Sequence, residues 1–359
     1  MIPVWNNEVQ EKEMQNFREA IAGRNIMEGI VLEEFERQIK ELLKVDYVVG
    51  VSSGSAALAL AFMGIGIKPG DEIIVPDLTF IATANAGKLL GATVVVAPVQ
   101  EDNLLLDLDK IDAYITYKTK AIVTVDLNGR IACGKKLREK YGSRGIYIID
   151  DACQAFMSCG KDGMPAGSHV DIACYSFGIT KMVTTIMGGL VATNNREIYE
   201  KIKIMKTQGM PSVFEGNEYA YPGFNFKLPD VLAAIGLGQL ERLDEKMKRM
   251  REIDQMYREE LSQLNCISFL DREKGELPWM TDILCEEKDK LRNILLRNEI
   301  SSRPLGSPIH NAYYLQHKGN YTCSNKMREK MLYVPSGPDQ DIKNVEKVIS
   351  VIKSNALDL

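Results

Sequence analysis

The stretch "YSFGITKMVTTIMGG", Tyr175 to Gly189, places a single lysine, Lys181, between a short strand-like run and a pair of glycines. No other side chain in this window carries a charge. An amine set among apolar residues loses the solvation of its charged form, which lowers its pKa. Such an amine acts as a nucleophile or condenses with an aldehyde. Lys181 is therefore a candidate for a covalent link to a carbonyl group.

Seven short β-branched and apolar runs surround this lysine between Tyr47 and Asn194. They are "YVVGVSS", "EIIVP", "TVVVAPV", "AIVTVDL", "GIYIIDD", "IACYSF" and "GGLVATN". Near-continuous apolar runs suit strands that are covered on both faces. The pattern predicts an α/β fold in which helices flank a mostly parallel seven-stranded sheet.

The pattern changes after Pro229. Apolar residues at period 3.6 predict one long connecting helix over 230–264. Beyond Asn265 follow a strand candidate, "LPWMTDILC", and two amphipathic helices, "EKDKLRNILLRNEI" and "DIKNVEKVISVIKS". With 359 residues the chain exceeds the usual size of a single core. We expect a large α/β domain, 1–245, and a smaller α+β domain, 246–359.

Composition narrows the class of protein. The formal net charge of −5 leaves no basic footprint for nucleic acid. Seven cysteines without a CxxC pair, beside only three histidines, indicate reduced thiols and no metal site. The N-terminus lacks a basic start followed by an apolar run, and no apolar stretch approaches the roughly 20 residues of a membrane span. We expect a cytoplasmic protein without membrane partners.

Two further motifs end predicted strands. In "VSSGSAALALAF" a helix follows the strand directly, and helix N-termini bind phosphate well. Alternatively, its serines only cap the helix. In "GIYIIDDACQAF", Asp150 and Asp151 follow an apolar run, and ligands of open parallel sheets bind beyond such strand ends. Alternatively, both acids cap a following helix.

A lysine, an acid and a phosphate-binding turn are together what pyridoxal phosphate requires. Its aldehyde needs a lysine, its pyridine nitrogen needs an acid that keeps it protonated, and its phosphate needs donors. Spacing alone does not decide whether these three elements meet.

The chain resembles the DegT/DnrJ/EryC1/StrS aminotransferases, a sugar-aminotransferase branch of the fold type I pyridoxal phosphate enzymes. The resemblance runs through "MIPVWNN", "SSGSAALALAF", "IIDDACQAF", "YSFGITK", "GFNFKLPDVLAAIGLGQL" and "SSRPLGSPIH". It implies an aspartate-aminotransferase-like fold. The C-terminal motifs look most like the perosamine-synthase-type branch.

The resemblance also implies roles for single residues. Lys181 would form the internal aldimine and carry protons, and Asp151 would pair with the pyridinium nitrogen. Gln154 would lie near the phenolic oxygen of the cofactor. Further contacts are implied for Phe80 on the ring face, for Ser55, Ala56 and Ser176 at the phosphate, and for Asn225 at the phosphate of a partner subunit. The last implies a homodimer with a shared active site.

At the substrate end, "RPLGSPIH" resembles the family spacing from arginine to histidine, so Arg303 and His310 are implied to line the cleft. A structural role for His310 is the alternative. "TTIMGG" departs from the family, because Ile186 and Met187 stand where relatives usually have glycine and glutamate. We expect this loop to alter substrate preference.

The resemblance implies a ping-pong aminotransferase. L-glutamate would convert the cofactor to pyridoxamine phosphate, which would then aminate a keto group of a nucleotide-linked keto-deoxy sugar. Alternatives are a small phosphorylated ketone as acceptor, a pyridoxamine-phosphate-dependent dehydratase, and a regulator that binds the cofactor without catalysis. Dehydratases of this family replace the lysine by histidine, so Lys181 favours transamination.

Overall fold

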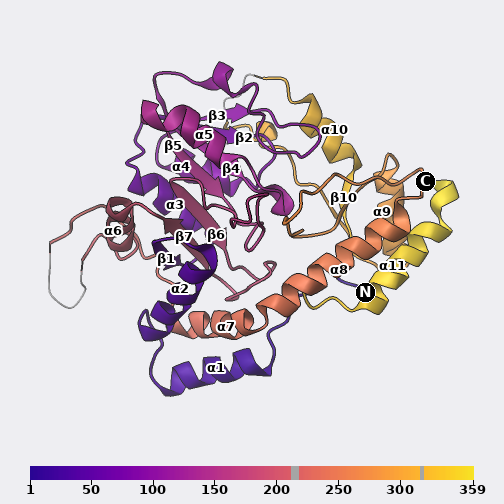
Figure 1. Ribbon diagram of the computed structural model, residues 1–359, viewed down its shortest axis with the longest axis horizontal. Coiled ribbons are helices and arrows are strands. Elements are labelled where there is room, and N and C mark those ends of the chain that lie inside the picture. The colour runs from indigo at the N-terminus through magenta and orange to yellow at the C-terminus, as the bar shows by residue number, and fades with distance from the viewer. Residues whose placement is uncertain (212–217, 316–318) are drawn as a thin grey trace.

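The seven apolar runs form one seven-stranded sheet in the order β1-β7-β6-β5-β4-β2-β3 (Figure 1). The computed structural model describes residues 1–211, 218–315 and 319–359. Only β7 runs antiparallel to its neighbours. The strands are β1 (Tyr47–Val51), β2 (Glu72–Pro76), β3 (Thr93–Ala97), β4 (Thr119–Val125), β5 (Tyr147–Asp151), β6 (Ile172–Ser176) and β7 (Gly189–Thr193). The predicted α/β class and mostly parallel sheet are confirmed.

The reversed direction of β7 creates the edge at which the site is built. Its first residue, Gly189, pairs with Val51 at the end of β1 and with Ser176 at the end of β6. The loop that carries Lys181 therefore leaves β6 and re-enters the sheet at the same edge. A Cβ atom on Gly189 would lie 2.4 Å from the carbonyl carbon of Ser53, so this approach requires glycine.

Helices lie on both sides of this sheet, and the C-terminal elements form a separate lobe beside it (Figure 1). In the described ranges, no helix combines the length and apolar character that crossing a membrane requires. The helices are α1 (Glu11–Ala22), α2 (Ile30–Leu43), α3 (Gly54–Gly64), α4 (Ala82–Leu89), α5 (Gly134–Tyr141), α6 (Arg196–Met205), α7 (Asp230–Glu241), α8 (Leu243–Leu261), α9 (Lys288–Arg297), α10 (Thr322–Lys330) and α11 (Ile342–Ser354).

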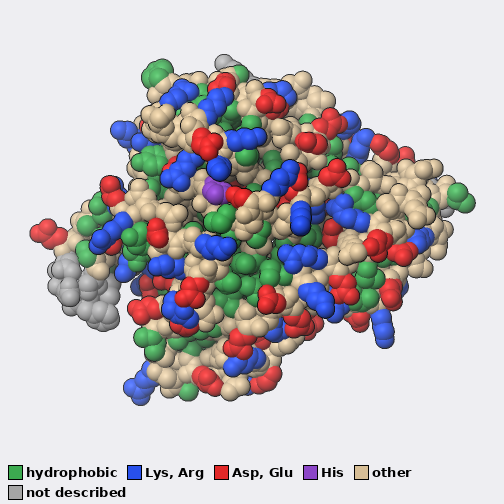
Figure 2. All heavy atoms as spheres, viewed as in Figure 1, with side chains coloured by type: hydrophobic (Ala, Val, Ile, Leu, Met, Phe, Trp, Pro, Cys, Tyr) green, Lys and Arg blue, Asp and Glu red, His purple; other side chains and the backbone are tan. Residues whose placement is uncertain are grey.

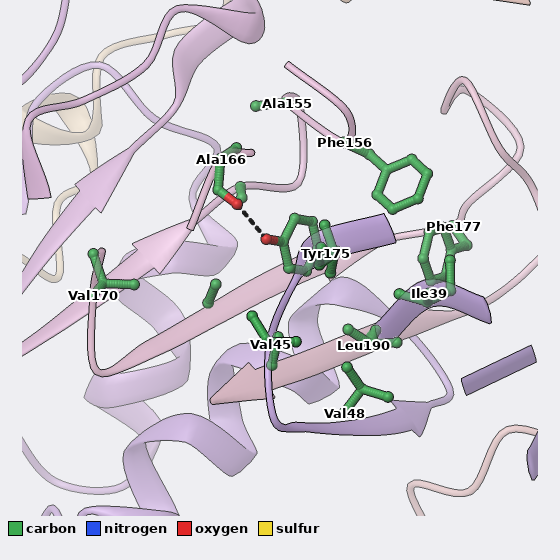
Figure 3. Close-up of a cluster of buried hydrophobic side chains, with 14 of the residues drawn as sticks. Ile39, Val45, Val48, Ala155, Phe156, Ala166, Val170, Tyr175, Phe177 and Leu190 are labelled. Carbon is green, nitrogen blue, oxygen red and sulfur yellow. Dashed lines mark hydrogen bonds between the residues drawn. The ribbon is translucent and has the colours of Figure 1, made fainter. Parts of the chain in front are cut away.

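Buried aromatic side chains anchor the end of β6, just before the lysine loop (Figure 3). Phe177 packs edge-to-face against Phe35 and Phe156, with ring centroids 5.3 and 5.4 Å apart. The buried hydroxyl of Tyr175 donates to the carbonyl oxygen of Ala166 over 2.5 Å. Truncating a buried Phe to Ala typically costs about 3–5 kcal/mol, so this packing holds the start of the loop firmly.

The region after Pro229 corrects one prediction. Instead of one helix over 230–264, α7 and α8 meet at Arg242, whose φ of −103° and ψ of 13° interrupt the helix. The side chain of Arg242 forms an ion pair with Asp339, far along the chain, which local periodicity does not reveal.

The C-terminal lobe contains a small sheet in the order β8-β10-β9, formed by β8 (Asp282–Leu284), β9 (Arg303–Pro304) and β10 (Met331–Tyr333). The strand candidate "LPWMTDILC" shortens to β8. Both predicted amphipathic helices are present as α9 and α11. The division into 1–245 and 246–359 stays a prediction, and α8 passes through that boundary.

Candidate active site

Lys181 lies in the loop between β6 and β7, with its side chain half-buried. It lines a pocket together with Cys153, Gln154, Ser176 and Trp279. Burial lowers the pKa of the Lys181 amine, and the Arg303 guanidinium adds to this effect, whereas Cys153 and Asp151 oppose it. A larger fraction of Lys181 is thus the neutral, nucleophilic amine than at a solvated lysine.

Three hydrogen bonds hold the main chain around this lysine. The Lys181 amide donates to the carbonyl oxygen of Gly178 over 3.0 Å. The indole N–H of Trp279 donates to the Thr180 carbonyl oxygen over 2.7 Å, and the side-chain amide of Asn7 donates to the Lys181 carbonyl oxygen over 2.6 Å. Two residues far from the loop in the sequence, one near the N-terminus and one in the C-terminal lobe, therefore fix it.

Asp151 ends β5 at the same edge of the sheet, with 6% of its surface exposed. The hydroxyl of Thr83 donates to its Oδ2 over 2.6 Å, and the amide of Cys153 donates to its Oδ1 over 3.2 Å. The Thr83 hydroxyl also lies 2.9 Å from the carbonyl oxygen of Phe80. The Phe80 side chain is 62% exposed and is available to cover a planar ring.

Asp150 lies on the opposite face of β5, because successive strand residues alternate. It accepts from the Thr124 hydroxyl over 2.7 Å. Burial raises the pKa of Asp150 to about 6. Burial, and the negative charge of Asp150, likewise raise the pKa of the neighbouring Asp126. Turns rather than a helix follow Asp151, so the alternative that both acids cap a helix is wrong.

The start of α3 supplies the phosphate-binding turn. Ser53 is the N-cap, and its hydroxyl oxygen accepts from the amide of Ala56 over 3.1 Å. Capping thus accounts for Ser53, whereas the side chain of Ser55 is exposed. A Cβ atom on Gly54 would lie 2.9 Å from Cys153 Sγ and from Ser176 Cβ, so the helix start, Ser176 and the acid-bearing strand meet here.

This set of groups fits pyridoxal phosphate. A lysine of lowered pKa, a buried carboxylate and a helix N-terminus with a nearby hydroxyl gather at one edge of the sheet. These are respectively the partners of its aldehyde, its pyridine nitrogen and its phosphate.

Gln154 is tied to the C-terminal lobe through Asn128. The amide of Asn128, a buried residue with a left-handed φ of 54°, donates to Gln154 Oε1 over 2.8 Å. Its side chain donates to the Met280 carbonyl oxygen over 2.9 Å and accepts from the Met280 amide over 2.8 Å. This double hydrogen bond places the adjacent Trp279 in the pocket.

The two residues predicted at the substrate end have different surroundings. Arg303 is exposed, and its guanidinium lies 5.6 Å from the centre of the Trp279 ring. His310 Nδ1 lies 2.8 Å from an oxygen of the buried Asp77, and its ring stacks on Tyr321 with centroids 4.6 Å apart. These contacts suit the alternative of a structural histidine as well as a role in the cleft, and both roles stay predictions.

Asn225 is exposed and forms an isolated bridge with Thr207. It does not belong to the residues that line the Lys181 pocket. Its implied contact with a partner subunit stays a prediction.

Sequence reasoning missed Trp279, Thr83 and Asn7. Trp279 appeared only within a strand candidate, and its contact with Lys181 joins residues far apart in the chain. Thr83 follows the predicted ring-covering Phe80 by three residues, a spacing that marks neighbours on one helical turn. Asn7 lies inside the motif "MIPVWNN", which singles out the segment without indicating its contact.

Comparison with known proteins identifies the family of this chain. A profile of the DegT/DnrJ/EryC1/StrS aminotransferase family matches residues 7–353. GDP-perosamine synthase of Escherichia coli O157:H7 is 33% identical over 98% of this chain and 97% of that protein. GDP-perosamine synthase of Vibrio cholerae is 30% identical over 99% of each chain. The solved structure of the aminotransferase TlmJ from Streptoalloteichus hindustanus matches with a TM-score of 0.94 and 26% identity, covering 100% of this chain and 99% of that one. The chain therefore belongs to the DegT/DnrJ/EryC1/StrS aminotransferase family and is a pyridoxal-phosphate-dependent enzyme of fold type I.

Proposed function

We propose that this enzyme moves an amino group from L-glutamate to a keto group of a nucleotide-linked keto-deoxy sugar by a ping-pong mechanism. The observation that carries the proposal is the half-buried Lys181 amine of lowered pKa, at the sheet edge shared by Asp151 and the start of α3. The GDP-perosamine synthases among its relatives support a nucleotide sugar as acceptor.

Pyridoxal phosphate, when bound, supplies an electron sink for the carbon that loses a proton. The Asp151 carboxylate would hold the proton on the pyridine nitrogen, with Thr83 keeping the carboxylate in place. Ser55, Ala56 and Ser176 would bind the phosphate. Gln154 would lie by the phenolic oxygen, and Phe80 would cover the ring face.

The Lys181 amine would accept a proton at Nζ from the carbon that bears the amino group and deliver it to the adjoining cofactor carbon. This requires the neutral amine, whose fraction the lowered pKa makes larger than at a solvated lysine. Arg303, exposed beside the pocket, has the fork of donors that binds a phosphate oxygen pair, as a nucleotide sugar presents. His310 would lie at the same substrate end.

The direct test replaces Lys181 with alanine. Lys181→Ala should lose both turnover and the visible absorbance of cofactor joined to protein, and a variant that keeps both would refute the assignment. Wild-type protein is then offered L-glutamate. Cofactor absorbance that no amino donor changes would instead favour a regulator.

The acceptor is tested by comparing keto-sugar nucleotides with small phosphorylated ketones. We expect amination of the nucleotide sugar. Loss of a hydroxyl without incorporation of nitrogen would instead identify a dehydratase, which retention of Lys181 disfavours. Exclusive turnover of the small ketone would assign the acceptor to that class.

We further propose a cytoplasmic homodimer with shared active sites. Phe80, Ile186 and Met187 are exposed large hydrophobic side chains near the site, as is Phe224 beside Asn225. Figure 2 shows hydrophobic side chains gathered near the centre of one face, among Lys and Arg side chains. If Asn225 completes the partner's site, mixing inactive Lys181→Ala and Asn225→Ala chains should restore roughly a quarter of wild-type activity through mixed dimers. No restoration would argue against a shared site.

A further inference from the structure

Lys246, in α8, is fully buried and has no role in the chemistry proposed above. Its Nζ donates to Asn7 Oδ1 and to Gln239 Oε1, each over 2.6 Å, and to the Met182 carbonyl oxygen over 3.3 Å. An ammonium group has three donors, and these three contacts use all of them. A buried lysine of this kind is costly unless every donor is satisfied.

These contacts lead directly to the catalytic loop. The side-chain amide of Asn7 accepts from Lys246 and donates to the carbonyl oxygens of Lys181, over 2.6 Å, and of Met182, over 3.4 Å. Lys246 and Asn7 together therefore bind the main chain of two consecutive residues. The side chain of Lys181 does not take part in these backbone contacts and lines the pocket.

Charged groups from three other parts of the chain surround Lys246. Asp339 Oδ2, before α11, lies 3.7 Å from its Nζ, and Arg242, between α7 and α8, forms an ion pair with the same carboxyl. The buried Glu13 of α1 lies 3.7 Å from Arg242 and accepts from Gln239 over 2.8 Å. Lys246 and Arg242 thus face Asp339 and Glu13. Because buried charges lose their hydration, such a group is stable only when the cations and anions stay close together.

We propose that Lys246 and Asn7 are positioning residues that hold the backbone of Lys181 so that its amine meets the cofactor aldehyde. This inference rests on the proposed role of Lys181. It explains why a charge network is buried at this position, where apolar side chains could fill the same space.

The network also provides a pH dependence. Burial lowers the pKa of Lys246 to about 8, with Asp339 and Glu13 opposing the shift and Arg242 adding to it. A neutral amine has only two N–H donors, so one of the three contacts is lost above that pH. The contacts that fix the backbone of Lys181 should therefore weaken above about pH 8.

The test measures how fast cofactor-free protein captures pyridoxal phosphate covalently, followed by absorbance from pH 6 to pH 10 and by peptide mass spectrometry after borohydride reduction. The wild-type rate of capture, relative to that of Lys246→Arg at the same pH, should fall above about pH 8. Asn7→Asp keeps the partner of Lys246 but removes the donor to Lys181. Asn7→Asp and Lys246→Met should each capture pyridoxal phosphate about tenfold more slowly, because loss of a positioning contact misplaces the Lys181 amine.

Two further variants separate positioning from mere stability. Lys246→Arg keeps the charge but does not titrate in this range, so it should restore most of the rate and abolish the alkaline fall. Lys248→Met, at an exposed position in the same helix, should behave as wild type. Folding of each variant is checked by urea unfolding.

Wild-type rates and an unchanged pH profile in Asn7→Asp and Lys246→Met would overturn the proposal. So would an alkaline fall that persists in Lys246→Arg. The proposed role of Lys181 fails separately, if borohydride fixes the cofactor on a peptide that lacks Lys181 or if Lys181→Ala captures it normally.

Discussion

The side-chain nitrogen Nζ of Lys181 lies 4.4 Å from the centre of the Trp279 ring. The same indole donates its N–H to the carbonyl oxygen of Thr180, so one side chain touches both the backbone and the amine of the lysine loop. The ring face attracts a cation, whereas burial disfavours one. Trp279 therefore limits how far the pKa of Lys181 can fall.

Replacing Trp279 tests this balance. Loss of the cation–π contact, which stabilises the charged form by about 0.5–2 kcal/mol, should lower the pKa of the Lys181 amine further in Trp279→Leu. The pH dependence of Lys181 acetylation in cofactor-free protein, quantified by peptide mass spectrometry, measures the change. Trp279→Phe keeps a ring face and should shift the pKa less. An unchanged profile in the leucine variant would contradict the prediction.

Thr83→Val should weaken the acid side of the pocket. It removes the hydroxyl that donates to Asp151 over 2.6 Å and leaves a buried carboxylate oxygen without that donor. We expect the free energy of unfolding to fall by about 1–3 kcal/mol, together with weaker retention of cofactor during dialysis. Thr83→Ser, which keeps the hydroxyl, is the control and should retain most of both. Unchanged stability and cofactor retention in Thr83→Val would contradict the prediction, because that variant keeps the methyl group and lacks only the hydroxyl.

Ile186→Gly should stabilise the protein. Ile186 has a φ of 69°, where a β-branched residue is strained by about 1–2 kcal/mol. Glycine relieves that strain but loses about 0.5–1 kcal/mol through the freedom of the unfolded chain, so a net gain of about 0.5–1 kcal/mol is expected in urea unfolding. Met187→Gly, at the adjacent exposed residue, should give no gain. A destabilised Ile186→Gly would mean that the isoleucine side chain contributes contacts that outweigh its strain.

The raised pKa of Asp150 predicts a pH-dependent stability. An ordinary aspartate titrates near 3.9, whereas Asp150 titrates at about 6 in the fold. Between those values the folded state binds the extra proton, so this group's contribution to stability falls as the pH rises from about 4 to about 6 and stays lost above.

Asp150→Asn removes that titration. The unfolding free energy of the variant minus that of wild type should rise across the same window by about 1–3 kcal/mol. Urea unfolding at several pH values measures it, with the exposed Asp102→Asn as the matched control. A difference that stays constant with pH would refute this prediction.

Local pattern was sufficient to predict the seven strands, because each is a short, largely buried apolar run bounded by polar or small residues. The same holds for Lys181 and Asp151, which follow or end such runs and therefore lie at the binding edge of the sheet. Helix boundaries were harder to predict from the sequence. The break at Arg242 depends on Asp339, and no feature of 230–264 alone reveals that partner.

The sequence by itself thus determined the fold class, because apolar runs and strand ends are local properties of the chain. Its family motifs indicated pyridoxal phosphate as cofactor and pointed to Lys181 as the lysine proposed to bind it. Only the tertiary structure decided that Trp279 faces Lys181, that Thr83 holds Asp151, and that Asn7 and Lys246 hold the lysine backbone. These contacts join segments as much as 239 residues apart. Such pairings arise from how the layers pack, and side-chain donors and acceptors find one another only after the fold has brought them together.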